Sequence, residues 1–593
     1  MRDYLVIEQD VGSHEAGWRA AEARLLADAR WRKVAERRGL SIFLETARAP
    51  KYRHLPSVAG GLIGDVFDAQ TAHEGRGEEL GLLGFGGDTT DIAWRLVERG
   101  FGRYVAILTD AHGPARVLRD PLGAMEAIGW RRDGVRFIAS RLPEDLPWLW
   151  PRELAIDWEA LAAILRQKNL ASHVCPLQGV TSYEPGVLSG PDGAGVRLWS
   201  PDRFAARLEP HADPAQLRCR LDGVVAAWTQ GRGGMFCEIS GGLDSAIVAC
   251  SLARTRAPPL FAIHHGFPQA EADERRHAQV IADHIKVPLV VVERDHLYLA
   301  PEKFVAGAGG PRPNYVGGDP DYDADLARRL GEPGVEAVFT GRGGDAVLYQ
   351  TALPALVRDV LRGRSDLSRA RGLEILARRN QLTVWTVLSR GLAARDLRAG
   401  AGLQSFLAAD VAAAPAALHP WLAAAKDLDP ARQVQILGMV NGLSAFRESA
   451  RHRVGDVIDP WMSQPIVEFC LAVSPGRLAV DWHDRPFARR AFADRLPPQA
   501  LARRGKGNLA TYFARSVAES LDVLRPFLLD GGLARAGLLD REHLAATLSA
   551  DHLIWSGVTA EIFILIAIEA WVQRWTKRLA DRDQGADPAA ATG

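Results

Sequence analysis

The sequence predicts an α/β protein in two parts, an α+β domain over residues 1–210 and a parallel-sheet domain with a helical layer over residues 211–581. Short β-like runs between glycine-rich turns fill the first part. From residue 236 to residue 340, β-like and helical segments alternate, which favours a parallel sheet with helices on both faces. Residues 350–450 are rich in Ala, Leu and Arg and contain few β-branched runs, as is typical of packed helices.

Composition and charge exclude several classes of protein. With 593 residues, 47% of them hydrophobic, the chain can bury more than one core. Its 72 basic and 72 acidic residues cancel, so no net field attracts nucleic acid or an anionic membrane. The longest apolar stretch, Ile562 to Ile568, is far shorter than the roughly 20 residues of a membrane span. We therefore expect small or neutral partners, and neither nucleic acid nor a membrane.

Five cysteines are scattered along the chain without a C-x-x-C pair: Cys175, Cys219, Cys237, Cys250 and Cys470. Two of them lie in apolar segments. We expect all five to be buried thiols in a reducing compartment, which predicts a cytoplasmic protein.

In the first part, residues 41–44, 104–108 and 117–123 predict strands. Residues 18–38 are alanine-rich and charged, with apolar residues at roughly helical spacing, which predicts an amphipathic surface helix. A stretch rich in Pro, Gly and Ser over residues 185–201 precedes the expected domain boundary.

The stretch from residue 236 to residue 250 predicts a strand, a tight turn and a helix. Gly241 and Gly242 permit positive φ, so successive backbone N–H groups can point into one concavity. The hydroxyls of Ser240 and Ser245 add donors at the start of the helix, where an anion is favoured. A lone glycine pair is more often a plain turn. The complete Ser-Gly-Gly-Leu-Asp-Ser sequence between a strand and a helix instead predicts a phosphate-binding loop.

Asp244 places a carboxylate among these anion-binding groups. This is explained if a cation such as Mg²⁺ bridges the carboxylate to the phosphates. The spacing is not the G-x-x-x-x-G-K-[ST] of P-loop proteins. It resembles the S-G-G-x-D-S loop of ATP pyrophosphatases, which release AMP and pyrophosphate while they adenylate a carboxylate or another oxygen. The resemblance implies that Ser240, Gly241, Gly242, Asp244 and Ser245 bind ATP with Mg²⁺.

A second loop repeats this chemistry. Residues 335–340 predict a strand, and Thr-Gly-Arg-Gly-Gly-Asp ends and follows it. In parallel sheets ligands bind at the carboxyl ends of the strands, so the two loops can hold one ATP. We expect Asp244 and Asp345 to ligate the metal, and Gly341 and Gly343 to line the nucleotide. The second loop resembles the S-G-x-G-x-D-E of asparagine synthetases.

Two positions of the second loop depart from the asparagine synthetase pattern. Arg342 stands where asparagine synthetases have glutamate and β-lactam synthetases have tyrosine, and an arginine cannot accept a proton. Ala346 replaces the glutamate that follows the aspartate. Free aspartate needs groups that hold its ammonium, so both changes count against that substrate.

The first part also resembles a known domain. Its strands, which end in Arg-Asp-Pro-Leu-Gly at residues 119–123, are similar to those of the glutaminase-type domain of asparagine synthetases, an Ntn-hydrolase-like fold. Members of that family begin Met-Cys, and the cysteine strips ammonia from glutamine. Position two is Arg2 here. The resemblance therefore implies a domain that is inactive as a glutaminase and serves as a scaffold or a substrate-binding surface.

Two motifs near the C-terminus narrow the resemblance. Residues 458–465, Ile-Asp-Pro-Trp-Met-Ser-Gln-Pro, predict a loop that enters a helix over residues 466–472. Asparagine synthetases have E-x-R-x-P-F-L-D there, and the ending Ser-Gln-Pro resembles lasso peptide cyclases. Residues 485–506 match the family's R-x-x-x-R, L-P and R-x-K series. The resemblance gives Lys506 the role of binding the triphosphate and offsetting charge on pyrophosphate and at the acyl centre.

Together these resemblances imply a lasso peptide cyclase with Lys506, Asp244 and Asp345 as catalytic residues. ATP, with Mg²⁺, would adenylate an Asp or Glu side chain of a precursor core peptide, and the peptide's N-terminal amine would attack. A leader peptidase and a leader-recognition protein are implied partners. Two alternatives stay open: an asparagine synthetase-like or β-lactam synthetase-like ligase of a small substrate, and a non-catalytic nucleotide-binding scaffold. Residues 582–593 predict a disordered tail.

Overall fold

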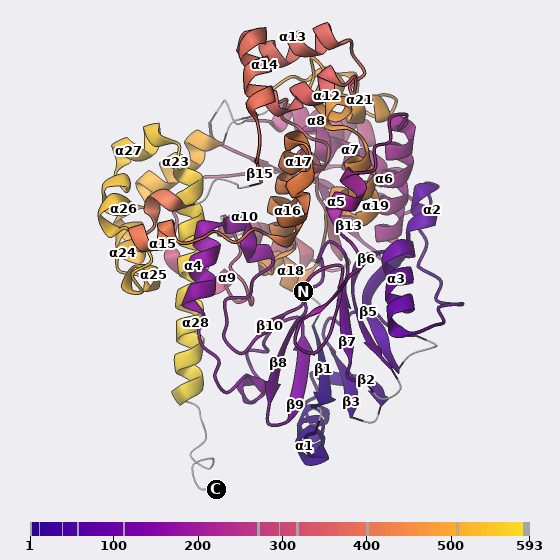
Figure 1. The fold of residues 1–593 in the computed structure, drawn as a ribbon, viewed down its shortest axis with the longest axis vertical. Coiled ribbons are helices and arrows are strands. Elements are labelled where there is room, and N and C mark those ends of the chain that lie inside the picture. The colour runs from indigo at the N-terminus through magenta and orange to yellow at the C-terminus, as the bar shows by residue number, and fades with distance from the viewer. Residues whose placement is uncertain are drawn as a thin grey trace.

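The chain forms two antiparallel sheets at one end and a parallel sheet with most of the helices at the other (Figure 1). This computed structural model describes residues 3–10, 12–37, 39–55, 59–110, 113–269, 273–295, 297–315, 319–398, 403–505, 507 and 509–584. The predicted α/β class, with a parallel sheet and a helical C-terminal region, is confirmed. Within these residues, no helix has the length and apolar character that crossing a membrane requires.

Two six-stranded antiparallel sheets face each other in the N-terminal part. One contains, in spatial order, β10 (Thr181–Ser182), β8 (Ile128–Arg132), β9 (Val135–Ala139), β1 (Tyr4–Gln9), β3 (Leu40–Glu45) and β2 (Trp31–Arg37). The other contains β12 (Gly195–Arg197), β11 (Val187–Ser189), β7 (Arg116–Arg119), β6 (Gly100–Thr109), β5 (Ala59–Asp68) and β4 (Tyr52–His54). Val6 and Ile42 of the first sheet pack against Ile107 and Val117 of the second, so this core lies between the sheets.

The three strands predicted in this part are present as β3, β6 and β7, although β7 ends at Arg119 and not at residue 123. The helix predicted over residues 18–38 is wrong in extent. Helix α1 spans Glu15–Leu26, and much of the remaining range forms the edge strand β2. β2 is half-exposed and carries mostly charged side chains, so no apolar alternation marks it as a strand. Its antiparallel pairing with β3, across a turn where Gly39 has a φ of 76°, determines its conformation.

The parallel sheet has the spatial order β15 (Leu289–Glu293), β14 (Ala262–Gly266), β13 (Met235–Glu238), β16 (Ala337–Phe339) and β17 (Asp456–Ile458). Helices α7 (Leu243–Leu252), α8 (Arg275–Ile285) and α10 (Pro320–Leu330) lie between its strands in the chain, which confirms the predicted alternation. β17 corrects the prediction, because the sequence places Ile458 in a loop. Three residues are too few for a strand signal, and the pairing of Val457 with Val338 determines this strand.

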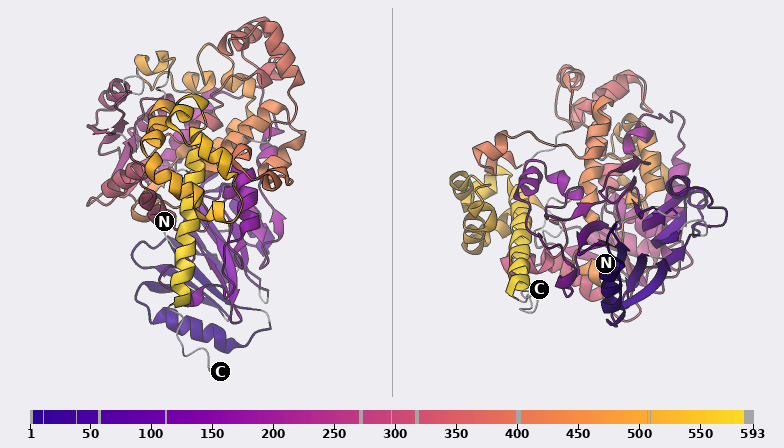
Figure 2. Two further views of the ribbon diagram at one scale, coloured as in Figure 1. Left: turned by 90° about the vertical axis from the view of Figure 1, so that its left-hand side faces the viewer. Right: turned by 60° about the horizontal axis from the view of Figure 1, so that its bottom comes forward.

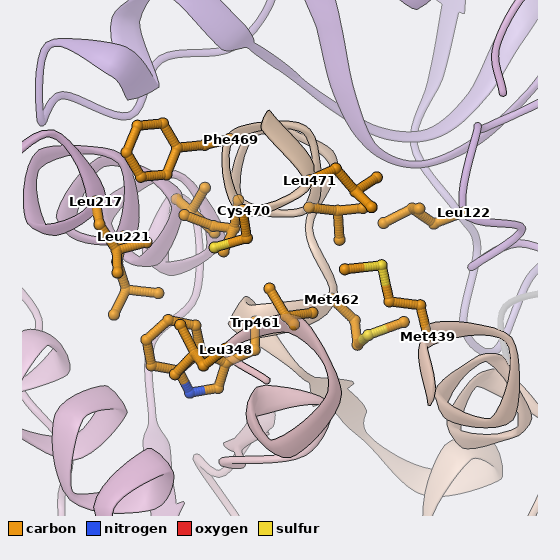
Figure 3. Close-up of a cluster of buried hydrophobic side chains, with 14 of the residues drawn as sticks. Leu122, Leu217, Leu221, Leu348, Met439, Trp461, Met462, Phe469, Cys470 and Leu471 are labelled. Carbon is orange, nitrogen blue, oxygen red and sulfur yellow. The ribbon is translucent and has the colours of Figure 1, made fainter. Parts of the chain in front are cut away.

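The other long helices are α3 (Thr89–Arg99), α4 (Trp158–Arg166), α6 (Pro214–Thr229), α13 (Arg369–Arg379), α14 (Val384–Ala393), α17 (Pro430–Gly442), α19 (Gln464–Ala472), α23 (Ala510–Glu519), α24 (Leu521–Leu529) and α28 (Thr559–Gln584). The helix predicted over residues 466–472 is therefore confirmed as α19. Leu217 and Leu221 of α6 belong to one core with Phe469 and Cys470 of α19 (Figure 3). Through this core the helices pack against the parallel sheet.

Four of the five cysteines are buried, and one is not. Burial raises the pKa of Cys175, Cys250 and Cys470 to about 12, and it raises the pKa of Cys237 as well. Cys219 corrects the prediction, because it lies on the solvent side of α6 and is exposed.

Helix α28 runs alongside the N-terminal part (Figure 2). The rings of Trp575 and Trp150 lie 6.1 Å apart, and the indole N–H groups of Trp571 and Trp575 both donate to the carbonyl of Gly310. One hydrophobic core thus contains residues from both sides of the expected domain boundary. The predicted tail begins inside α28, and residues 585–593 lie outside the described part of the chain.

Glu126 connects the two parts through three arginines. Its Oε1 lies 3.0 Å from Nη1 of Arg119, its Oε2 lies 2.8 Å from Nη1 of Arg447, and Oε2 also pairs with Arg312. All four side chains are buried. Burial by itself would raise the pKa of Glu126, but the three guanidinium groups outweigh burial and lower it to about 2. The carboxylate therefore holds together segments that are distant in sequence.

We expect Glu126→Gln to lower the free energy of unfolding by about 3–5 kcal/mol, because it leaves buried guanidinium groups without their counter-charge. Denaturant unfolding at neutral pH measures the loss. Glu79→Gln is the control, since Glu79 pairs with Lys51 at the surface, and it should cost less than about 1 kcal/mol. Because the folded pKa of Glu126 lies below the ordinary 4.5, its contribution is present above pH 4.5 and is lost as the pH falls towards 2. Equal losses for the two variants would contradict this role.

Candidate functional site

The first predicted loop has the expected strand, turn and helix, from β13 to α7. Gly241 has a φ of 79°, which a side chain would strain, and Gly242 is the N-cap residue of α7. A Cβ on Gly241 would also lie 3.1 Å from Nη1 of Arg503. The turn stands at the N-terminus of a 10-residue helix, where backbone N–H groups and the helix dipole favour an anion.

The two predicted serine ligands contact each other across the turn. Ser240 Oγ and Ser245 Oγ are 3.1 Å apart, and the backbone N–H of Ser240 donates to Ser245 Oγ at 3.2 Å. The backbone N–H of Gly242 donates to Ser240 Oγ at 3.3 Å. The hydroxyls therefore brace the loop itself, and their contact with phosphate remains a prediction.

The second predicted loop packs directly against the first. A Cβ on Gly341 would lie 2.5 Å from the backbone nitrogen of Ser245, and a Cβ on Gly344 would lie 2.5 Å from Cγ of Asp244. Gly343 has a φ of 82°, so it too is in a conformation that favours glycine. The glycines of the second loop therefore allow the two loops to touch, which places both at one edge of the sheet.

Arg485 lies between the two predicted metal ligands, Asp244 and Asp345. Its Nη1 pairs with Oδ2 of Asp244 and lies 3.9 Å from Oδ1 of Asp345. The side chain of Asp244 is 9% exposed and that of Asp345 is 55% exposed. Burial acts to lower the pKa of Arg485, but Asp244 and Asp484 outweigh burial and raise it. The structure thus brings both aspartates to one positive charge, and this charge belongs to an arginine that the sequence did not pair with them.

Two carboxylates that face one cation fit a Mg²⁺ ion that takes its remaining ligands from phosphates and water. Among the residues that the structure describes, no group of three or more His, Cys, Asp or Glu side chains is arranged to hold a metal. A metal at this site would therefore depend on the nucleotide, and Arg485 would have to release Asp244 to admit it.

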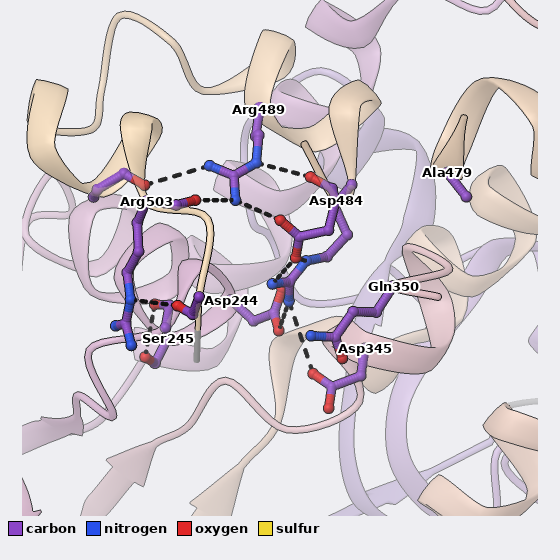
Figure 4. A network of polar contacts seen from close by, with 12 residues as sticks. Asp244, Ser245, Asp345, Gln350, Ala479, Asp484, Arg489 and Arg503 are labelled. Carbon is purple, nitrogen blue, oxygen red and sulfur yellow. Dashed lines mark hydrogen bonds and ion pairs between the residues drawn. The ribbon is translucent and has the colours of Figure 1, made fainter. Parts of the chain in front are cut away.

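Further arginines link these aspartates to the first loop. Asp484 pairs with Arg485 and, at 2.6 Å, with Arg489. Arg489 Nη2 donates to the backbone carbonyl of Arg503 at 3.1 Å, and Arg503 donates to the carbonyl of Gly241 (Figure 4). The R-x-x-x-R motif marks this stretch in the sequence, but only the fold shows which carboxylates and carbonyls its arginines contact.

The predicted Lys506 lies outside the described residues. The residues on either side of it lie close to the first loop. Arg503 Nε donates to the carbonyl of Gly505 at 2.7 Å, and Arg503 also pairs with Glu274. The backbone N–H of Gly507 donates to Glu274 as well. The basic series therefore reaches the first loop, as the predicted role of Lys506 requires.

Arg342 of the second loop is half-buried, and Nη1 of its guanidinium is shielded from solvent. Its backbone N–H donates to Oγ1 of Thr340 at 3.1 Å. Burial acts to lower the pKa of Arg342, but Tyr322, Asp459 and Glu238 outweigh burial and raise it. The loop thus presents a positive charge at this position and no proton acceptor, as the sequence predicts.

A cavity of about 520 Å³ opens beside the first loop, at the carboxyl ends of β13 and β14. Residues of α23 and α28 close its far side. Its apolar lining includes Phe267, Tyr315, Phe513, Phe563 and Ile564, and its polar lining includes Glu238, Ser240, His264, His265 and Glu274. The volume is typical of a small-molecule site. The sequence did not predict the cavity, because its walls come from distant segments.

We expect Gly341→Ala to abolish ATP binding while the protein stays folded, because the new Cβ would overlap the backbone of Ser245 and force the loops apart. Titration calorimetry with ATP measures binding, and circular dichroism checks the fold. Gly81→Ala is the matched control, since a Cβ there would meet nothing within 4 Å. ATP affinity of Gly341→Ala within a few-fold of the parent would contradict the direct packing of the two loops.

We compared the sequence with protein family models and with curated proteins. The chain matches the family model described as Asparagine synthase over residues 216–573, which include both loops, Arg485 and the walls of the cavity. A search of curated proteins gave no match. The matched range covers more than half of the 593 residues. The chain therefore belongs to the asparagine synthase family and is an ATP-dependent, amide-forming ligase.

Proposed function

We propose that this ligase closes a macrolactam ring in a ribosomally made precursor peptide. ATP adenylates an Asp or Glu side chain of the leader-trimmed peptide, and the N-terminal amine of the same peptide then forms an isopeptide bond. Membership of the asparagine synthase family supports ATP-dependent amide formation. A peptide substrate is a more specific proposal than family membership supports. It is favoured by the second loop and by the motifs near the C-terminus.

The phosphates of ATP fit the first loop, and the nucleoside fits the adjoining cavity. Arg485 and Arg503 supply positive charge on the same side of the loop. Asp244 and Asp345 would hold Mg²⁺, which when bound neutralises phosphate charge and polarises the reacting phosphoryl group. The aromatic walls of the cavity exclude water from an acyl-adenylate, which limits its hydrolysis.

The reaction has two balanced steps. In the first, a carboxylate oxygen attacks the α-phosphorus of ATP, and the bond from this phosphorus to pyrophosphate breaks. In the second, the amine nitrogen attacks the acyl carbon, the bond to AMP breaks with its electron pair on AMP, and the nitrogen gives one proton to water. Positive charge from Arg485, Arg503 and Lys506 stabilises the negative charge that develops on both leaving groups.

The observation that carries the peptide proposal is the half-buried guanidinium of Arg342 in the second loop. A peptide N-terminal amine has an ordinary pKa of about 7.7–8.0, so a substantial neutral fraction can attack without a strong base. The positive charge of Arg342 also repels the ammonium of a free amino acid such as aspartate. A larger acid that brings its own amine satisfies both conditions.

We propose that residues 1–210 form a glutaminase-type scaffold without glutaminase chemistry, ahead of the ligase domain over residues 211–581. Arg2, which stands where the related synthetases have cysteine, lies outside the described residues. None of the five cysteines lies near the N-terminus, and burial makes four of them poor nucleophiles. We therefore expect no release of glutamate from glutamine.

We further propose that the enzyme works with a leader peptidase and a leader-recognition protein, because the peptide amine must be freed before the ring closes. We also propose that it works in the cytoplasm. The zero net charge provides no attraction to nucleic acid or to an anionic membrane. A reducing compartment suits its free thiols.

We expect the protein, ATP, Mg²⁺, a candidate core peptide and its leader peptidase to yield a peptide lighter by one water in mass spectrometry. Asp244→Asn and Asp345→Asn should each abolish peptide-dependent AMP formation, because each removes a charge from the metal and pyrophosphate site. Asp551→Asn, exposed on α27 (Ala550–Ser556), is the control. Normal turnover by either site variant would refute the metal assignment. Turnover of aspartate and ammonia, without turnover of peptide, would favour a small-substrate ligase.

We expect Lys506→Ala to bind ATP almost normally but hardly to turn over, because its charge acts chiefly on the leaving groups. A contact made in the transition state is worth about 2.7–4 kcal/mol, roughly a hundred- to thousandfold in rate. Rapid-quench assays of ring closure measure the rate, and calorimetry measures ATP affinity. Lys577→Ala, exposed on α28, should behave as the parent. If Lys506→Ala cyclised peptide within a few-fold of the parent rate while ATP affinity collapsed, Lys506 would be a binding group only.

A further inference from the structure

Two neighbouring histidines at the end of β14 line the cavity and have no part in the proposed chemistry. Nδ1 of His264 lies 2.8 Å from the carbonyl oxygen of Ile239. Because a carbonyl oxygen only accepts, Nδ1 carries the proton, and Nε2 of the neutral ring is an acceptor. His264 is 3% exposed, and its Nε2 has no hydrogen-bond partner among the described residues.

His265 presents a second acceptor. Its Nε2 lies 3.1 Å from Oδ2 of Asp325 and donates to that carboxylate, which leaves Nδ1 as an acceptor. Nδ1 has no hydrogen-bond partner in the described part of the chain, and it lies 4.0 Å from Oε1 of Glu238. Burial lowers the pKa of His265, although Glu238 and Asp325 act in the opposite direction. The ring therefore stays neutral at cytoplasmic pH.

The two acceptors approach the cavity from opposite faces of β14. Consecutive residues of a strand project to opposite faces, yet both histidines line this one cavity, which therefore wraps around the strand end. Glu238 is on the His265 side, where its Oε1 accepts from the hydroxyl of Tyr322 at 2.6 Å. Buried acceptors without donors are costly. A ligand of this cavity must therefore bring N–H or O–H donors at two separate places.

Adenosine carries donors in this arrangement, with an amino group on the base and hydroxyls on the ribose. We propose that His264 accepts a hydrogen bond from the exocyclic amino group of adenine, and that His265, beside Glu238, accepts one from a ribose hydroxyl. A carboxylate next to an imidazole acceptor suits two vicinal hydroxyls, as acidic residues do in dinucleotide sites. The lone acceptor of His264, Nε2, suits an amino group and disfavours a carbonyl at the same position. This inference rests on the proposed placement of the ATP nucleoside in the cavity.

Conservative variants can remove each acceptor and keep the contact behind it. His264→Asn keeps an amide N–H near the position of Nδ1, where it donates to Ile239, and it lacks Nε2. His265→Gln keeps an amide N–H near the position of Nε2, where it donates to Asp325, and it lacks Nδ1. His284→Gln is the matched control, because His284 is exposed on α8 and its Nε2 contacts the carbonyl of Arg495.

Titration calorimetry with Mg²⁺ and without peptide compares ATP, ITP, which has a carbonyl in place of the amino group, and 2′-deoxy-ATP. The parent and His284→Gln should prefer ATP over ITP by roughly ten- to hundredfold. His264→Asn should reduce this preference to within about threefold and leave the preference over 2′-deoxy-ATP unchanged. His265→Gln should weaken the preference over 2′-deoxy-ATP and leave the ATP-to-ITP ratio unchanged.

Equal affinity of the parent for ATP and ITP would overturn the inference, and so would an unchanged ATP-to-ITP ratio in His264→Asn. Exchanged effects, with His264→Asn acting on 2′-deoxy-ATP and His265→Gln acting on ITP, would overturn the assignment of base and ribose. The experiment needs no peptide. If the predicted ratios appear while no peptide is cyclised, the nucleoside site stands and the proposed substrate fails.

Discussion

Direct packing of two glycine loops at one edge of the parallel sheet is the constraint on which the site depends. Gly341 meets the backbone of Ser245, and Gly344 meets the side chain of Asp244, at distances that admit no Cβ. This contact requires β13 and β16 to be neighbours, as their parallel pairing makes them. The hydroxyl of Thr340 donates a hydrogen bond to Oδ1 of Asp459, and this bond connects the second loop to the end of β17. The short last strand is therefore part of the site's support.

Charged contacts connect the C-terminal segment to the two loops. Arg485 pairs with Asp244, and Arg503 pairs with Glu274 and donates to the carbonyl of Gly241, so residues far along the chain lie on the first loop. These arginines contact carboxylates and a backbone carbonyl of the protein. Binding of a nucleotide would exchange some of these contacts for contacts with phosphate. Such a site keeps its positive charge in place before the substrate arrives, which is the arrangement that electrostatic catalysis needs.

Local signals explain what the sequence predicts well. The strand, turn and helix around Gly241, and the alternation that defines the parallel sheet, follow from apolar runs and glycines that are adjacent in the chain. Long-range pairing explains what it misses. β17 is too short to show a pattern, and β2 is a half-exposed edge strand formed by its pairing with β3. The partnership of Asp244 with Arg485, like the two acceptors in the cavity, is a property of the folded chain that no spacing in the sequence reveals.

Transfer of oxygen from the acid to AMP tests the central claim most directly, because it reports the bond that an adenylating ligase must form. A core peptide whose acceptor side-chain carboxylate carries ¹⁸O is incubated with ATP and the protein until the ring closes, and the AMP is analysed by mass spectrometry. The proposed mechanism predicts one ¹⁸O in the phosphate of each AMP that accompanies a ring, since that oxygen stays on phosphorus when the amine displaces AMP. Ring closure with unlabelled AMP, or with the label in inorganic phosphate, would contradict it.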